Sequence, residues 1–215
     1  KLFSTIGRRK IPAHKKESLA REPFVLDINK VTHVYFPLVA GNNAACDPLV
    51  KVGDKVKVGT RIAFRQQFSV PLFSSVSGTV SAIEKRMNVI TGRPCDHVVI
   101  ENDFKMEHDA LLEKVNLDAP KEHIVEAIKE AGIVGLGGAG FPTWLKYNNV
   151  KGIHTVLINA VECEPYLTTD YTLSKLNATK IVEGARYLQK AAEAKELVIA
   201  IKVKKEAARD ALIEA

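Results

Sequence analysis

The residues best suited to chemistry lie in one glycine-rich stretch, GIVGLGGAGFPTWLK at residues 132–146. Five of the nine positions from 132 to 140 are glycine, and glycine loses more conformational freedom on folding than any other residue. Such density is useful where a backbone must approach a ligand closely and direct several N–H groups at an anion. The stretch therefore predicts a phosphate-binding loop, in which Lys146 would neutralise the phosphate or hydrogen-bond the ligand's ring.

Two further features bear on this loop. A helix beginning near Thr143 would add a positive terminal field that favours a phosphate. Gly135, Gly137 and Gly140 also satisfy the GxGxxG spacing of dinucleotide-binding domains, but that fingerprint must follow a strand and open a helix. Here it follows an expected helix and precedes an expected strand, so we reject the Rossmann interpretation. Ligand binding and a tight structural connection remain as the two explanations of the loop.

The elements expected around the loop divide the chain into three parts. Residues 1–30 hold eight Lys and Arg against three acids and show no sustained period, which predicts a basic arm. Residues 31–105 contain short strands too closely spaced for crossover helices, which predicts an antiparallel β-domain. From 106 to 215 helical and strand patterns alternate, which predicts a parallel α/β domain. Because the chain stops within this alternation, we expect the α/β domain to continue in a longer protein.

Composition and charge exclude several classes of protein. With 46% hydrophobic and 26% charged residues, the chain is neither disordered nor fibrous. No stretch approaches the roughly 18–20 apolar residues that a membrane span needs, so no transmembrane segment is expected. Most of the net charge of +6 lies in the arm, which argues against a nucleic-acid partner. The three cysteines and six histidines have no metal-ligand spacing, so no metal site is expected.

Two segments of the β-domain resemble the halves of a biotinyl/lipoyl-type barrel-sandwich domain: VKVGDKVKVGTRIA at 50–63 and FSSVSGTVSAIE at 73–84. Their order is reversed relative to a simple carrier domain. Lys85, followed by Arg86 and Met87, does not occupy the exposed hairpin expected of a carrier's acceptor lysine. We therefore interpret the module as structural, with a swinging-arm carrier as the alternative.

The glycine-rich stretch supports a more specific resemblance. GLGGAGFPTWLK at 135–146 is similar to the flavin-binding loop of the NADH-oxidising subunit of respiratory complex I, whose pattern reads GxGGAGFPTGxKW. NAVECEPYLTTD at 159–170 corresponds to that subunit's Asn-Ala-(acidic pair)-Glu-Pro segment. With the sandwich module and PLVAGNNAACDPLVKVGDKVKVG in front, the chain resembles the RnfC family, the C subunit of the Rnf electron-transport complex. The resemblance covers nearly the whole chain.

Carried over residue by residue, the resemblance implies the contacts of two ligands. Six residues would hold FMN: Gly135, Gly137, Gly138, Lys146, Asn159 and Glu162. Two would contact the nicotinamide nucleotide, NADH: Phe141 and Glu164. The chain departs from the complex I pattern at three positions, with Leu136 for arginine, Trp144 for glycine and Val161 for an acid. No catalytic residue is assigned, because hydride transfer to a flavin needs no protein base.

The resemblance implies a β barrel-sandwich domain followed by an α/β flavin-binding domain of the complex I 51 kDa type. It implies NADH oxidation at FMN, with electrons passing to [4Fe–4S] clusters whose CxxCxxCxxxCP motifs would lie beyond this chain, so the chain alone would not complete the transfer. The implied partners are the other subunits of a membrane electron-transport complex, on the cytoplasmic face of the bacterial inner membrane. Two alternatives stay open: a non-enzymatic carrier or assembly module, and a soluble relative serving another reductase.

Overall fold

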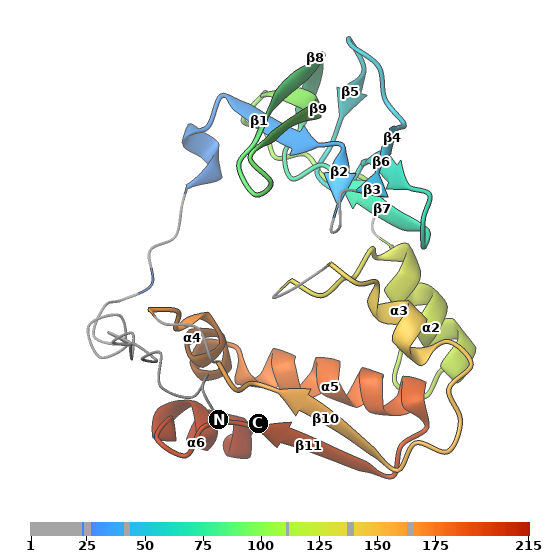
Figure 1. Cartoon of the computed structure of the whole chain (residues 1–215), viewed down its shortest axis with the longest axis vertical. Helices are drawn as coiled ribbons and strands as arrows, with labels where there is room; N and C mark the ends of the chain where they lie inside the picture. The colour runs from blue at the N-terminus through green and yellow to red at the C-terminus, as the bar shows by residue number, and fades with distance from the viewer. Residues whose placement is uncertain (1–22, 24–26, 41–43, 111, 137–139, 163–165) are drawn as a thin grey trace, which may run out of the picture. The chain divides into compact units, whose positions relative to one another are not determined.

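The computed structural model describes residue 23 and residues 27–40, 44–110, 112–136, 140–162 and 166–215 of the 215-residue chain. It divides into two compact units. The first unit is Leu26–Lys151 (Figure 1). The second unit includes Gly152–Ala215, of which residues 163–165 are not described, and Pro23. Nearly all of the expected basic arm lies outside the described residues. The domain boundaries expected at residues 30 and 105 remain a prediction.

An antiparallel sheet of four strands forms one side of the first unit. Its order is β1-β9-β8-β5, with β1 at His33–Pro37, β5 at Lys55–Val56, β8 at Gly78–Asn88 and β9 at Arg93–Asn102. The long β8–β9 hairpin is its centre, paired from Gly78 opposite Asn102 to Asn88 opposite Arg93. All of its ladders are antiparallel, as the close spacing of the strands predicted.

A smaller sheet supplies the other side of this unit. Its order is β4-β6-β7, with β4 at Asp47–Pro48, β6 at Arg61–Arg65 and β7 at Val70–Phe73. The unit also contains a separate short antiparallel pair, β2 at Val39–Ala40 and β3 at Ala44–Ala45, and a 3-10 helix at Ile28–Lys30. The connection of the β6–β7 hairpin, residues 66–69, includes two consecutive non-glycine residues with positive φ, Phe68 at 72° and Ser69 at 49°.

Apolar side chains from both sheets enclose one core. Strands place alternate residues on one face, and on β8 and β9 this puts Val80, Val98 and Ile100 inside with no exposed surface. The remaining members of the buried cluster are Leu38, Cys46, Val56, Ile62, Ala63 and Val76. Two sheets around a shared core is the layered architecture that the sandwich resemblance implied.

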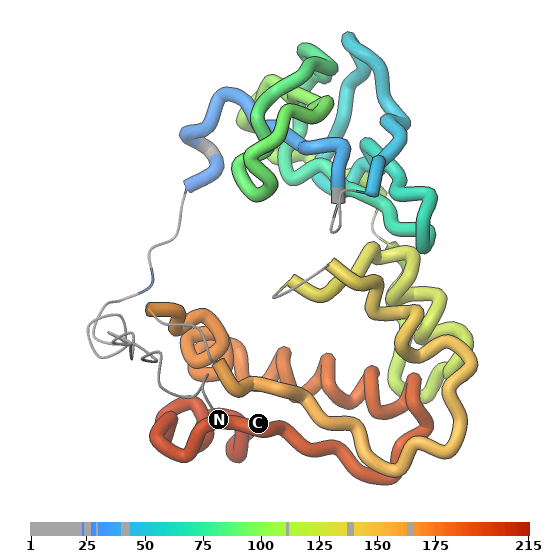
Figure 2. The backbone as a smooth tube through the Cα atoms, in the orientation of Figure 1, coloured from blue at the N-terminus to red at the C-terminus, as the bar shows by residue number. Residues whose placement is uncertain are grey.

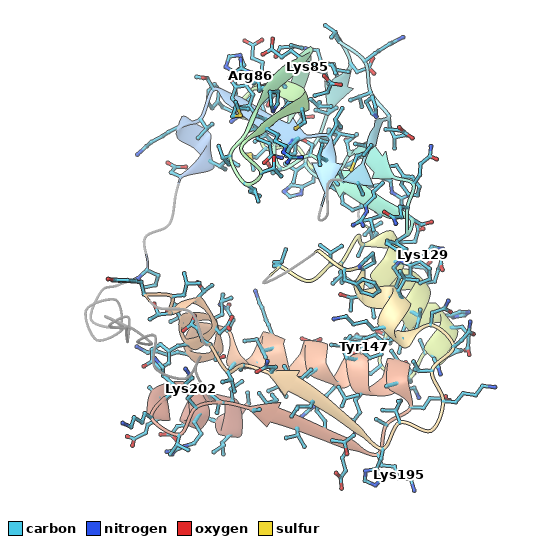
Figure 3. The ribbon with its side chains drawn as sticks, viewed as in Figure 1. Lys85, Arg86, Lys129, Tyr147, Lys195 and Lys202 are labelled. Atoms are coloured by element: carbon cyan, nitrogen blue, oxygen red, sulfur yellow. The ribbon has the colours of Figure 1, made fainter. Side chains whose placement is uncertain are left out.

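Lys85 lies on the β8 strand with its neighbour Arg86 (Figure 3). It pairs across the ladder with Asp96, and β8 continues beyond it to Asn88 before the hairpin turns. A swinging-arm lysine is expected at a hairpin tip. The position of Lys85 within a strand thus agrees with the structural interpretation of the module.

Two helices follow the sheets within the first unit, α2 at Lys121–Glu130 and α3 at Thr143–Tyr147. Ile124, Val125 and Ile128 recur at helical spacing on α2 and are buried. Residues 131–142 join the two helices, so both ends of the glycine-rich stretch are held by helices that pack on each other.

The second unit is a parallel α/β layer. β10 at Thr155–Asn159 pairs in parallel with β11 at Glu196–Ala200, Val156 lying opposite Leu197. Between them run α4 at Thr169–Leu176 and α5 at Ala178–Ala192, and α6 at Glu206–Glu214 follows. Figure 2 traces the return of α5 into β11. Ala185, Ala191 and Ala192 of α5 are buried. The order of strands and helices in this unit confirms the expected α/β alternation. No helix among the described residues is long and apolar enough to cross a bilayer.

The close approach of β8 to β9 generates a test of the sandwich. A Cβ atom at Gly78 would overlap the carbonyl oxygen of Glu101, so Gly78→Ala must push the central hairpin apart. We expect it to lower the free energy of unfolding by about 1–3 kcal/mol in urea denaturation followed by circular dichroism. Gly184→Ala on α5 is the matched control, because nothing lies within 4 Å of its Cβ position and alanine should stabilise the helix by about 0.5–1 kcal/mol. Equal stability of Gly78→Ala and wild type would contradict the pairing.

Candidate functional site

The glycine segment, defined as residues 132–146, begins at the C-terminal end of α2. Gly132 has φ +64°, and its N–H donates to the Lys129 carbonyl at 2.9 Å while the Ile133 N–H donates to the Ile128 carbonyl at 3.2 Å. This pair of bonds is the Schellman motif, which ends a helix with a left-handed residue. A Cβ at Gly132 would also lie 2.7 Å from the carbonyl oxygen of Pro71. The first glycine is therefore required by the fold.

The next residues close the segment into a loop with a fixed base. Val134 and Pro142 form an antiparallel bridge, the Gly135 N–H donates to the Phe141 carbonyl at 3.0 Å, and the Thr143 N–H donates to the Ile133 carbonyl at 2.9 Å. Gly135 and Phe141, two of the expected ligand contacts, are thereby brought together. Gly137 and Gly138 lie outside the described residues.

The β6–β7 hairpin of the sandwich holds this loop from outside. The Trp144 indole Nε1–H donates to the Phe68 carbonyl at 3.0 Å, and the Phe68 and Phe141 rings have centroids 5.9 Å apart. The Arg65 guanidinium lies 5.3 Å from the centre of the Phe68 ring, and its Nη1 donates to the Gly140 carbonyl at 3.3 Å. Sequence reasoning missed Arg65 and Phe68. Each lies about 75 positions before its partner in the glycine segment, and no local sequence pattern indicates such a contact.

α3 carries the expected cation. It begins at Thr143, as predicted, and spans five residues without a side-chain cap. Lys146 on this helix is exposed and makes neither an ion pair nor a hydrogen bond with any described residue. Lys129 of α2 and Tyr147 of α3 border the same helix pair (Figure 3). The Lys129 ammonium lies 5.5 Å from the Trp144 ring centre, and burial raises the pKa of the Tyr147 hydroxyl.

The remaining expected residues belong to the second unit. Asn159 is the last residue of β10, at the carboxyl end of a parallel strand, where open α/β sheets place ligands. Its Oδ1 accepts the Val161 N–H at 3.0 Å. Glu162 is only 7% exposed, and its Oε1 accepts the N–H of Asp170 in the first turn of α4 at 3.1 Å. Glu164 lies outside the described residues.

The interaction of Glu162 with Asp170 gives Glu162 a structural role that the sequence did not reveal. The first backbone N–H groups of a helix have no partner within it, and Thr168, at the N-cap position of α4, supplies no side-chain bond. A carboxylate at this end also interacts favourably with the helix dipole. Glu162 therefore stabilises the start of α4 from eight residues upstream. No group of three His, Cys, Asp or Glu within the described ranges could hold a metal ion.

Family comparisons place both halves of this arrangement in known classes. Residues 7–105 match the RnfC barrel sandwich hybrid domain, and residues 128–215 match the Nuo51 FMN-binding domain. The two matched domains therefore follow one another in the order that the RnfC resemblance implied. The expected fold, a barrel sandwich followed by a complex I-type flavin domain, is confirmed.

Individual relatives agree with this assignment. The chain is 37% identical over 213 residues to the C subunit of the Na(+)-translocating ferredoxin:NAD(+) oxidoreductase complex of Acetobacterium woodii, covering 95% of this chain and 47% of that protein. It is 32% identical over 208 residues to the C subunit of the ion-translocating oxidoreductase complex of Vibrio cholerae, covering 95% and 27%. The proton-translocating counterpart of Clostridium ljungdahlii is 33% identical over 187 residues, covering 85% and 41%. The chain spans less than half the length of each of these relatives.

The capping role of Glu162 can be separated from a ligand role by two substitutions. Glu162→Ala removes the acceptor for the Asp170 N–H, so we expect a loss of about 1–2 kcal/mol in the free energy of unfolding. Glu162→Gln keeps an oxygen at the same place and should lose less than half of that. Thermal denaturation of both variants beside wild type provides the measurement. If Glu162→Ala were as stable as wild type, the capping role of Glu162 at the start of α4 would be wrong.

Proposed function

We propose that this chain binds FMN and forms part of an electron-transfer subunit that exchanges a hydride with a nicotinamide nucleotide. Two observations support it: the match of residues 128–215 to the Nuo51 FMN-binding domain, and the closed base of the glycine segment. FMN, when bound, accepts an electron pair as hydride and gives up electrons one at a time. The task of the protein is to hold and orient it.

The described residues fit such a ligand. The base of the glycine segment uses the N–H groups of Gly135 and Thr143, whereas those of Leu136 and Phe141 donate to no described residue. Backbone donors with no partner among the described residues, in the same segment as an exposed lysine, suit an anionic and hydrogen-bond-accepting ligand. The residues that would hold FMN are Gly135, Gly137, Gly138, Lys146, Asn159 and Glu162.

The nucleotide would meet the same segment. Phe141 is 43% exposed, so part of its ring is available for stacking on adenine or nicotinamide, and Glu164 would accept hydrogen bonds from ribose hydroxyls. The names of the Acetobacterium and Clostridium relatives specify ferredoxin:NAD(+) oxidoreductase, the reverse of NADH oxidation. One site serves both directions, because a reaction and its reverse pass through the same transition state.

The wider role follows from the relatives. Their names place them in ion-translocating complexes, so we propose that this chain works with other subunits at the cytoplasmic face of a bacterial membrane. Electrons would continue to [4Fe–4S] clusters outside this chain. The carrier alternative gains no support, because Lys85 lies within β8.

A fluorescence titration tests the flavin proposal. Trp144 is the sole tryptophan and lies inside the glycine segment, so bound FMN should quench its emission with saturation at one equivalent. Lys146→Ala should weaken FMN binding about tenfold, the usual effect of losing a charge-assisted hydrogen bond. Lys85→Ala, which removes an exposed lysine from β8, should leave the affinity unchanged. An absence of quenching in the wild-type protein, or equal affinity of Lys146→Ala, would refute the assignment.

A further inference from the structure

A buried arginine stands directly beside the glycine segment. Arg65 is the last residue of β6 and only 4% exposed. Its Nη1 donates to the Gly140 carbonyl at 3.3 Å. Its Nε, also enclosed, hydrogen-bonds to no atom of the described residues. A guanidinium has five N–H donors in a fixed fork, and within the described part of the chain only the bond to Gly140 uses one of them.

The charge of Arg65 also lacks a counter-charge among the described residues. Among the described carboxylates none forms an ion pair with it, and the nearby Asp47 accepts instead from Gln66. Cys46 is close enough for the arginine to act on it, but burial, the larger effect, raises the pKa of its thiol, so it stays neutral. The Phe68 ring, whose centre lies 5.3 Å from the Arg65 guanidinium, offers a cation–π contact and no counter-charge.

An unpaired buried charge is costly. Removing an ion from water is compensated only by an opposite charge and by hydrogen bonds to its donors. Arginine is the side chain whose planar fork matches a phosphate group. Arg65 lies beside Gly140, and its Nε has no partner among the described residues. This arrangement suits an anion that arrives with a ligand.

We propose that Arg65, contributed by the barrel sandwich, binds the phosphate monoester of the flavin nucleotide held by the glycine segment. The proposal rests on the proposed flavin function and deepens it, because it makes the sandwich part of the ligand site. It assigns the sandwich hairpin a direct role in discriminating FMN from riboflavin, which lacks the phosphate.

The test compares two ligands on the same preparation of the full chain. Dissociation constants for FMN and for riboflavin are measured by flavin fluorescence with wild type, Arg65→Met and Arg65→Lys. Arg86→Met is the matched control. It removes an exposed arginine of β8 that contacts Glu84 and Tyr35 and leaves the same net charge as Arg65→Met. The measured quantity is the ratio of the riboflavin to the FMN dissociation constant, which does not depend on the fraction of protein that is folded.

We expect Arg65→Met to lower this ratio about tenfold or more, the effect of losing a hydrogen bond to a charged group. Arg65→Lys, which keeps the charge without the fork, should fall between wild type and Arg65→Met, and Arg86→Met should match wild type. An unchanged ratio in Arg65→Met, including equal weakening of both ligands, would overturn the assignment of Arg65 alone. If Arg65→Met fails to fold, a wild-type ratio in Arg65→Lys overturns it. Failure of wild type to bind either flavin would instead overturn the proposed function.

Discussion

The attachment of the glycine segment to the β6–β7 hairpin is the contact on which the candidate site depends. Five glycines between positions 132 and 140 would leave a free loop many conformations. The segment is restrained at three places: the Schellman end of α2, the bridge of Val134 to Pro142, and the Trp144–Phe68 hydrogen bond. The described ends of the segment, residues 132–136 and 140–146, are therefore held by the fold itself, and groups that are positioned before a ligand binds cost less entropy on binding.

This attachment gives the barrel sandwich a direct contact with the glycine segment. A carrier domain of this architecture presents a lysine at a hairpin tip, whereas here Lys85 lies within a strand and another hairpin supplies the contacts. Phe68 and Ser69 adopt positive φ in that hairpin, a conformation that costs non-glycine residues energy. The Phe68 carbonyl and ring, held in that turn, meet Trp144 and Phe141. The strained turn at Phe68 and Ser69 thus carries the contacts that hold the glycine segment.

The sequence predicted the elements better than their contacts. Strand spacing and helical periodicity are local, and they predicted the antiparallel sheets, the start of α3 at Thr143 and the β10–α5–β11 layer. The context of GxGxxG, after a helix, also predicted that the loop is not a Rossmann turn. Arg65 and Glu162 show what local patterns omit. An arginine in a strand is expected to be solvated, and only the folded structure shows Arg65 donating to the Gly140 carbonyl. The sequence indicated Glu162 as a ligand contact, and only the folded structure shows it accepting the Asp170 N–H at the start of α4. Both depend on tertiary contacts.

A nuclear magnetic resonance titration of the ¹⁵N-labelled chain with FMN tests the central claim most directly, because it locates the ligand residue by residue. If the hairpin and the glycine segment form one site, the backbone amides of Gly135, Phe141 and Lys146 should shift together with the Arg65 Nε–H, and all should saturate at the same FMN concentration. Shifts confined to the β8–β9 hairpin around Lys85, with these four signals unmoved, would contradict the account.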